Sequence, residues 1–229
     1  MQIDDLFKKN NIIAIAGNRD TAKTSLALSS LSYLRGKYPD LNIAVLGVNE
    51  ELIPVMRDLN ILVLTSKMDI LDLRLKNYIV YIDEFAMLFN PDAKNKEQEK
   101  LNRFFDRLAH LNTKLMLSTC REGYFNKYMC GRITCFLVKQ VEYEALVNGS
   151  WIKERIKAII SQSDYRLEAD NKEFYIVCND GTPTIKQVFK YEPLFDTKKD
   201  NKVLFPDVKA EIKTGKKDGK LNETQEVLK

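Results

Sequence analysis

The sequence predicts an α/β protein in which a mainly parallel sheet lies between helices. Short runs of Ile, Val and Leu alternate with segments of helical periodicity over the first two-thirds of the chain. This order is typical of parallel strands joined by helices. The strand-like runs carry no alternating polar residues, which indicates strands covered on both faces. The pattern leaves little room for an all-α or all-β fold.

The individual elements can be placed by their apolar periodicity and by the residues that interrupt it. Six strands are expected at 11–16, 42–48, 61–66, 78–84, 114–120 and 132–140. Helices are expected between them at 23–37, 50–59, 68–77 and 97–112. From about Glu142 the pattern changes to a helix at 149–162 and two β segments within 172–192, which surround the turn residues at 179–183. We expect these two segments to form a hairpin at the sheet edge.

The length and charge of the chain suit one domain with a short extension. The chain has 229 residues and a formal net charge of +4, which is compatible with nucleic-acid binding but too small to demonstrate it. We expect one domain over residues 1–196 and a basic, solvated tail over 197–229, since the tail has many lysines and few large apolar residues. The alternative is that the tail is a weak electrostatic arm for a polyanion or a protein partner.

Neither a membrane segment nor a cysteine-based metal site is expected. No apolar run approaches the roughly 18 residues that a membrane span needs, and the first residues lack the apolar stretch of a signal peptide. We therefore expect a soluble cytoplasmic protein. The four cysteines show no C-x-x-C spacing. Cys120 and Cys135 lie in apolar strand-like runs, where a thiol acts as a small hydrophobe, so neither zinc nor a disulfide is expected.

The segment "GNRDTAKTS" matches most of a phosphate-binding loop, G-x-x-x-x-G-K-[ST], between a strand and a helix. Such a loop surrounds phosphate with backbone N–H groups, places a lysine on the β- and γ-phosphates and a hydroxyl on Mg²⁺. Lys23 and Thr24 supply these two side chains. The predicted nucleotide-binding residues are Gly17, Asn18, Arg19, Asp20, Thr21, Ala22, Lys23, Thr24 and Ser25.

Two residues of this loop depart from the pattern. Ala22 replaces the second glycine, which is tolerable if its backbone is helical but costly if it is left-handed. Asp20 is repelled by phosphate unless it points away or pairs with a base such as Arg19. The alternative to a nucleotide site is an ordinary strand–helix junction with a chance match.

The strand "YIVYIDEF" ends in two acids at the edge where an α/β sheet binds ligands. Asp83 is suited to hold Mg²⁺, as the acid of a Walker B strand does, and Glu84 to orient or deprotonate a water. A strand ending in this acid pair resembles the additional-strand class of P-loop ATPases and favours hydrolysis over a kinase reaction. The alternative is a solvated strand end.

The same class implies two further roles. A polar residue at the end of the strand between the loop strand and the acidic strand senses the γ-phosphate; in "KLMLSTCREG" the candidate is Thr119, with Ser118 or Arg121 as alternatives. Arg103 and Arg107, four apart in the helix after the acidic strand, are candidate arginine fingers for a neighbouring subunit. The alternative for both arginines is a surface face with local ion pairs.

With these motifs in order, the chain resembles the FtsK/HerA superfamily of P-loop ATPases, especially viral DNA-packaging ATPases and the related Zot-like proteins. The resemblance rests on "GNRDTAKTS", "YIVYIDEF", "LMLSTCREG" and, more loosely, "KYEPLFDTKK", and covers roughly residues 12–199. The family usually has a glutamine in its sensor segment, where Cys120 stands nearby instead.

The resemblance implies an ATP- and Mg²⁺-dependent motor that acts as a homo-oligomeric ring on double-stranded DNA. For a viral protein it would add a capsid or other protein partner and a place in the host cytoplasm or the virion. Lysines at 94, 96, 100 and 127 and Arg121 are candidates to line the pore, with a solvated loop as the alternative. A RecA- or KaiC-like regulatory ATPase and an ATP-binding scaffold with a degenerate loop remain alternatives, as does an RNA track.

Overall fold

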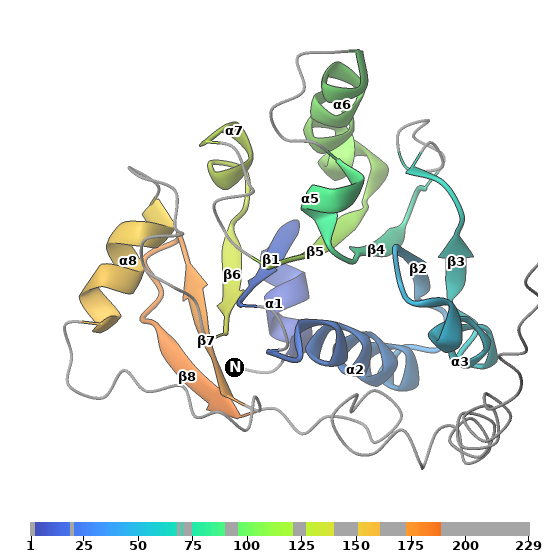
Figure 1. Cartoon of the computed structure of the whole chain (residues 1–229), viewed down its shortest axis with the longest axis horizontal. Coiled ribbons are helices and arrows are strands. Elements are labelled where there is room, and N and C mark those ends of the chain that lie inside the picture. Colours follow the sequence, from blue (N-terminus) through green and yellow to red (C-terminus); the bar gives the residue numbers. More distant parts are fainter. Residues whose placement is uncertain are drawn as a thin grey trace, which may run out of the picture.

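A computed structural model gives the structure of the chain and describes residues 3–18, 21–67, 70, 75–89, 96–120, 127–139, 151–160 and 173–188. These residues form one eight-stranded sheet with helices on both faces (Figure 1). The strand order is β3-β2-β4-β5-β1-β6-β7-β8. The predicted α/β fold class is confirmed. Most of the helix expected at 68–77 and the whole tail at 197–229 lie outside the described residues.

The strands follow the predicted segments closely. They are β1 (Ile12–Ala16), β2 (Asn42–Leu46), β3 (Leu62–Leu64), β4 (Tyr78–Ile82), β5 (Lys114–Thr119), β6 (Cys135–Val138), β7 (Glu173–Cys178) and β8 (Ile185–Val188). The six strands from β3 to β6 in the sheet order are parallel to their neighbours. The hairpin β7–β8 joins antiparallel to β6 and forms one edge, as expected.

The helices are α1 (Ile3–Lys9), α2 (Lys23–Lys37), η1 (Glu50–Leu52), α3 (Ile53–Asp58), α5 (Phe85–Leu88), α6 (Lys96–Leu111), α7 (Lys127–Cys130) and α8 (Trp151–Ile160). The predicted helix at 50–59 is confirmed as a short 3₁₀ turn followed by α3, whose first turn contains a proline. No helix among the described residues is long and apolar enough to cross a membrane.

Two apolar cores lie on opposite faces of the sheet, because successive side chains of each strand point to opposite sides. One core joins the sheet to α1, α2 and α3, and the other joins it to α5, α6, α7 and α8 (Figure 1). Along α6, the predicted apolar face is confirmed: Leu101, Phe104, Phe105 and Leu108 are buried and Leu111 packs beside them. Burial on both faces explains why the parallel strands are apolar throughout.

The sheet order brings three strand ends together. β5 lies between β1 and β4, and Ala16 is level with Thr119, while Ile82 is level with Leu117. Because these strands are parallel, their carboxyl ends meet at one edge, where α/β sheets bind ligands. The phosphate-type loop after β1 and the acid pair after β4 are therefore neighbours.

Candidate nucleotide-binding site

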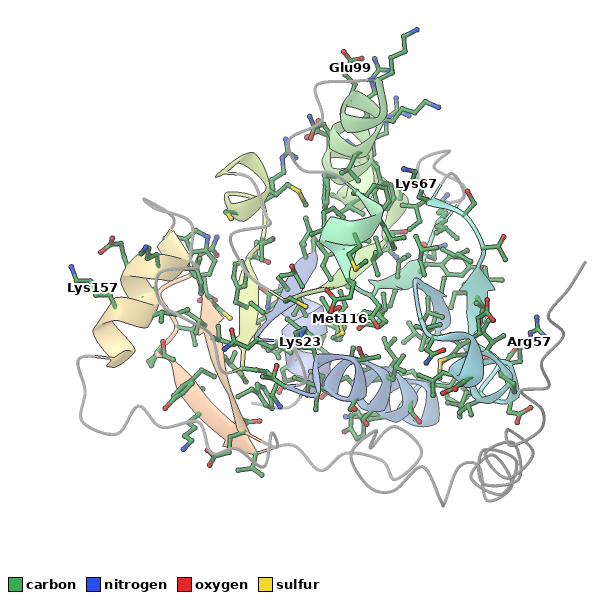
Figure 2. The ribbon with its side chains drawn as sticks, in the orientation of Figure 1. Lys23, Arg57, Lys67, Glu99, Met116 and Lys157 are labelled. Carbon is green, nitrogen blue, oxygen red and sulfur yellow. The ribbon has the colours of Figure 1, made fainter. Side chains whose placement is uncertain are left out.

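The loop after β1 curls around its own lysine. The carbonyl oxygen of Asn18 accepts hydrogen bonds from Thr21 Oγ1 at 2.8 Å and from Lys23 Nζ at 3.0 Å. Lys23 begins α2 close to the strand ends (Figure 2) and its side chain is only 5% exposed. Ser25 is buried in the same first turn. Arg19 and Asp20 lie outside the described residues.

Ala22 adopts the backbone conformation for which a glycine is suited. Its φ is 56° and its ψ 37°, in the left-handed region, and it is the N-cap residue of α2. The condition under which alanine would be harmless, a helical backbone, is therefore not met. A left-handed alanine costs about 1–2 kcal/mol relative to the right-handed form. This strained conformation at Ala22 turns the chain so that Lys23 lies at the strand ends.

Replacing Ala22 with glycine is expected to raise the free energy of unfolding by about 0.5–1 kcal/mol, because relief of strain outweighs the extra chain entropy of glycine. Chemical denaturation with Ala27→Gly as control measures this. Ala27 lies inside α2 and is fully buried, so its replacement is expected to lower stability by about 1 kcal/mol. A loss of stability in both variants would contradict the strain at Ala22.

Asp83, directly after β4, collects hydrogen bonds from the elements around it. Its Oδ1 accepts from Tyr81 Oη at 2.7 Å, from the Glu84 backbone N–H at 3.1 Å and from Ser118 Oγ. Its Oδ2 accepts from Thr24 Oγ1 at 2.9 Å. Burial, together with the charge of Asp83, raises the pKa of Tyr81 well above its usual value, so that hydroxyl stays protonated and donates. The carboxylate is thus fixed in orientation toward the first turn of α2.

The Glu84 carboxylate lies between Lys23 and Cys120. Glu84 Oε1 is 3.9 Å from Lys23 Nζ, and Cys120 Sγ is 3.1 and 3.2 Å from the two carboxylate oxygens. Burial and the hydrogen bond to Glu84 raise the pKa of the Cys120 thiol, which keeps the proton on sulfur and makes it the donor. Glu84 itself has a left-handed backbone, with φ 42° and ψ 52°. Such strain in a non-glycine residue is frequent at functional sites.

The acid pair is contacted by the residues on either side of Thr119, the predicted sensor at the end of β5. Ser118 bonds to Asp83 and Cys120 to Glu84, whereas Thr119, which is fully buried, belongs to the opposite face of the strand by alternation. The structure therefore places the alternative candidate Ser118, and also Cys120, beside the acid pair, and the sensor role of Thr119 stays a prediction. Cys120 is correspondingly half-buried and polar in its contacts, not the small core hydrophobe expected from its apolar surroundings. Arg121 lies outside the described residues.

Gly47, after β2, allows the acidic strand end to pass close by. Its φ is +79°, and a Cβ there would lie 2.9 Å from the Asp83 carbonyl oxygen and 2.9 Å from Leu88 Cδ1. The neighbouring Leu46 carbonyl accepts the Asp83 N–H at 2.9 Å. This supporting residue was not among the predicted site residues, although a single glycine that ends a strand is a signal of close backbone approach.

Gly47→Ala is expected to lower the free energy of unfolding by about 2 kcal/mol or more, since it adds a left-handed alanine and a contact with fixed backbone. Gly36→Ala is the matched control: nothing lies within 4 Å of a Cβ at Gly36, which is in α2. There alanine is expected to stabilise by about 0.5–1 kcal/mol. Equal thermal shifts in the two variants would contradict the close approach at Gly47.

The two candidate finger arginines lie on the exposed side of α6. Arg103 and Arg107 are both exposed, and Arg103 Nη2 is 4.0 Å from Glu99 Oε2, with both side chains at least 70% exposed. Asp106, between these two arginines in α6, pairs with Arg132. The predicted surface face is present, and the role of the arginines toward a second subunit stays a prediction.

The residues around Asp83 have the chemistry that Mg²⁺ requires, since hard cations prefer carboxylate and hydroxyl oxygens. Thr24 and Asp83 bring one of each within 2.9 Å. Groups of three or more His, Cys, Asp or Glu that could hold a metal do not occur within the described part of the chain. The donor set therefore suits an ion held jointly with phosphate oxygens and waters, not a closed protein cage.

Comparison with known proteins gives likeness in structure only. No family model and no curated protein matches the sequence. The genome packaging NTPase B204 from Sulfolobus turreted icosahedral virus 2, in complex with AMPPCP, has a TM-score of 0.58 and 12% identity, covering 80% of this chain and 99% of that chain. The pCW3 conjugation coupling protein TcpA with ATPgS has a TM-score of 0.56 and 14% identity, over 80% of this chain and 61% of that chain. EssC (ATPases 2 and 3) from Geobacillus thermodenitrificans has a TM-score of 0.56 and 12% identity, covering 90% of this chain and 44% of that chain.

The fold is that of the P-loop NTPases, with the additional strand β5 between the loop strand and the acidic strand. The structures it resembles include a viral genome-packaging NTPase, a conjugation coupling protein and an ATPase. The P-loop NTPase fold that the motifs indicated is thus confirmed. Two of these structures contain nucleotide analogues.

Proposed function

We propose that this chain hydrolyses ATP to move a nucleic acid, most concretely as a double-stranded DNA translocase of the packaging type. One observation carries the proposal: Lys23 and Thr24 lie against Glu84 and Asp83 at the edge where the strand ends meet. A strand–helix junction with a chance match to the loop pattern would not require two acids from another strand to face its lysine and threonine.

Each of these side chains has a definite task in the proposed reaction. Lys23 binds the β- and γ-phosphates, with the backbone N–H groups of the loop around them. Thr24 and Asp83 hold Mg²⁺, which when bound neutralises charge on the phosphate oxygens. Glu84 orients the attacking water and accepts its proton. Tyr81 and Ser118 keep the Asp83 carboxylate in place.

The contacts of Glu84 support a coupling between nucleotide binding and the availability of this carboxylate as a general base. Among the described residues, Glu84 supplies the carboxylate that pairs with Lys23, at 3.9 Å. A γ-phosphate carries more negative charge and competes for the same ammonium group. Once the ammonium group binds phosphate, the contact of Glu84 that persists among the described side chains is that with the Cys120 thiol, which is a weak donor. The carboxylate then becomes available to a water.

The proposed oligomer rests on the exposed arginines. The Arg103–Glu99 pair joins two largely solvated side chains at 4.0 Å, and such pairs contribute about 0–1 kcal/mol. Arg103 can therefore exchange this partner for a phosphate at little cost. Lys96 and Lys100, exposed at the start of the same helix, are proposed contacts to the DNA backbone, which needs charge but no base readout. The other proposed pore residues, Lys94 and Arg121, lie outside the described residues, as does the side chain of Lys127.

The test is the rate of Mg²⁺-dependent ATP hydrolysis with and without long double-stranded DNA, with double-stranded RNA as the second track. Parallel light-scattering runs give the oligomeric state. DNA-stimulated turnover by an oligomer, lost in Arg103→Ala and Arg107→Ala without loss of ATP binding, is the expected result. Glu51→Gln, an exposed glutamate on η1, is the control that should leave turnover unchanged.

Three other results would replace the proposal. Stimulation of turnover by RNA but not by DNA would mean that the motor moves along RNA. Turnover by a monomer, indifferent to either polymer, would favour a regulatory ATPase with a protein partner. ATP binding without any turnover would show that Ala22 and Asp20 have made the site a scaffold.

A further inference from the structure

Two of the four cysteines meet outside the nucleotide site. β6 and β7 run antiparallel, and Cys135 is directly opposite Cys178 in their register. Their sulfur atoms are 2.7 Å apart. Both residues are buried, with exposures of 0% and 5%. Neither has a part in the nucleotide site.

The hydrogen-bonding pattern decides whether the backbone suits a covalent link here. The Asn179 N–H donates to the Thr134 carbonyl at 3.1 Å, so Thr134 and Asn179 form a hydrogen-bonded pair. Because such pairs alternate with non-hydrogen-bonded pairs, Cys135 and Cys178 form a non-hydrogen-bonded pair. The Cα atoms of such a pair are about 4.5 Å apart, which lies within the range of about 4.4–6.8 Å found for disulfides.

We propose that Cys135 and Cys178 are a redox site that closes to an intrachain, cross-strand disulfide when the protein meets a peroxide. The register, the sulfur separation and the non-hydrogen-bonded pairing all permit the link without moving either strand. This modification is independent of ATP turnover and goes beyond the function proposed above.

The chemistry of the step balances with hydrogen peroxide as the oxidant. The Cys178 thiolate attacks one peroxide oxygen, so an S–O bond forms, the O–O bond breaks and hydroxide leaves. That hydroxide takes the Cys135 proton, and the resulting thiolate attacks the Cys178 sulfur, which forms the S–S bond and expels the second hydroxide. With the original thiol proton of Cys178, the products are one disulfide and two waters. Each sulfur loses one electron and the peroxide gains two.

The surroundings of Cys178 suit it for the first attack. The contact with Cys135, and the positive charges of Lys9 and Arg155, lower the pKa of Cys178, whereas the same contact and burial raise the pKa of Cys135. Burial and the charge of Asp180 oppose this effect but are outweighed. Cys178 ends β7, beside the exposed turn residues Asn179 and Asp180. Cys178 is therefore the one of the pair that lies next to an exposed turn, and it is 5% exposed whereas Cys135 is 0% exposed.

Mass spectrometry of the full chain tests the site without relying on any variant. The protein is treated with hydrogen peroxide, quenched with catalase, labelled with N-ethylmaleimide in denaturant and digested without reductant. Labelling is expected to fall from four cysteines to two, with a cross-linked peptide pair containing Cys135 and Cys178. Dithiothreitol should restore all four, and the melting temperature of the oxidised form should rise by several degrees, because the link restricts the unfolded chain.

Variants separate this site from the other thiols. Cys178→Ser is expected to abolish the cross-link, whereas Cys130→Ser, in α7, should leave it intact. The proposal is overturned if peroxide leaves Cys135 and Cys178 open to maleimide. It is equally overturned if either forms a disulfide with Cys120 or Cys130, or if Cys178 becomes a sulfinic acid with no link to Cys135.

Discussion

Glu84→Gln is expected to lower ATP turnover by about 10²–10⁴-fold, the usual contribution of a positioned general base, while ATP binding is retained. The amide has nearly the shape of the carboxylate but cannot accept a proton from water. It also loses the charge that attracts Lys23 across 3.9 Å. We therefore expect the dissociation constant for ATP to stay the same or fall.

Single-turnover hydrolysis and equilibrium binding of a fluorescent ATP analogue measure these two quantities separately. Glu51→Gln makes the same chemical change at an exposed position and serves as the control for both. If Glu84→Gln retained turnover within about threefold, well below the contribution of a general base, the base would have to be another residue. The assignment of Glu84 would then fail even if the protein proved to be an ATPase.

Lys23→Ala is expected to weaken ATP binding by about 10²-fold or more and to remove measurable turnover, because its ammonium group is a principal charge-assisted contact to phosphate. The lysine is 95% buried and is already held at the loop by the Asn18 carbonyl, so little ordering remains to be done on binding. Its loss removes the cation that pairs with the Glu84 carboxylate in the described part of the chain, but that carboxylate is about one-third exposed to solvent. We therefore expect only a small change in stability.

Isothermal titration with ATP and Mg²⁺ measures the affinity, and thermal unfolding shows whether the variant is folded. Lys8→Ala is the matched control, since Lys8 is 65% exposed on α1 and has no part in the site. Unchanged ATP affinity in Lys23→Ala, with a folded protein, would mean that this loop does not bind the phosphates. If the protein binds ATP at this loop but is not a motor, Lys23→Ala would still lose ATP affinity. The titration therefore tests the phosphate-binding role of the loop separately from the motor function.

Elements with strong local patterns could be predicted from the sequence, and those held by distant contacts could not. The strands and the long helices α2 and α6 were predicted because apolar periodicity is a local property. The helices α1, α5 and α7 have only seven, four and four residues. Helices this short are not stable alone and depend on burial of residues such as Leu6, Phe7 and Phe85 in the two cores.

In the candidate site, too, features set by local sequence could be predicted and features set by distant contacts could not. Lys23, Thr24, Asp83 and Glu84 were identified because their spacing to strand ends is a sequence property. The left-handed backbone of Ala22 depends on how the loop closes against the sheet, which no single residue type reveals. To place Cys120 beside Glu84, one must know which face of the sheet each residue of β5 points to, and not only that β5 is a strand. To pair Cys135 with Cys178, one must know the register between β6 and β7.

β1 carries the phosphate-type loop, yet both strands that flank it are made long after it. Ile12 is level with Leu115 of β5, and Ile13 with Cys135 of β6. During synthesis from the amino terminus, this strand must therefore remain without these sheet partners until β5, which ends at Thr119 of the 229 residues, has left the ribosome. Such distant pairing slows folding and exposes apolar surface in the meantime. The nascent chain is thus expected to depend on chaperones until β5 emerges, and to acquire a usable nucleotide site only then.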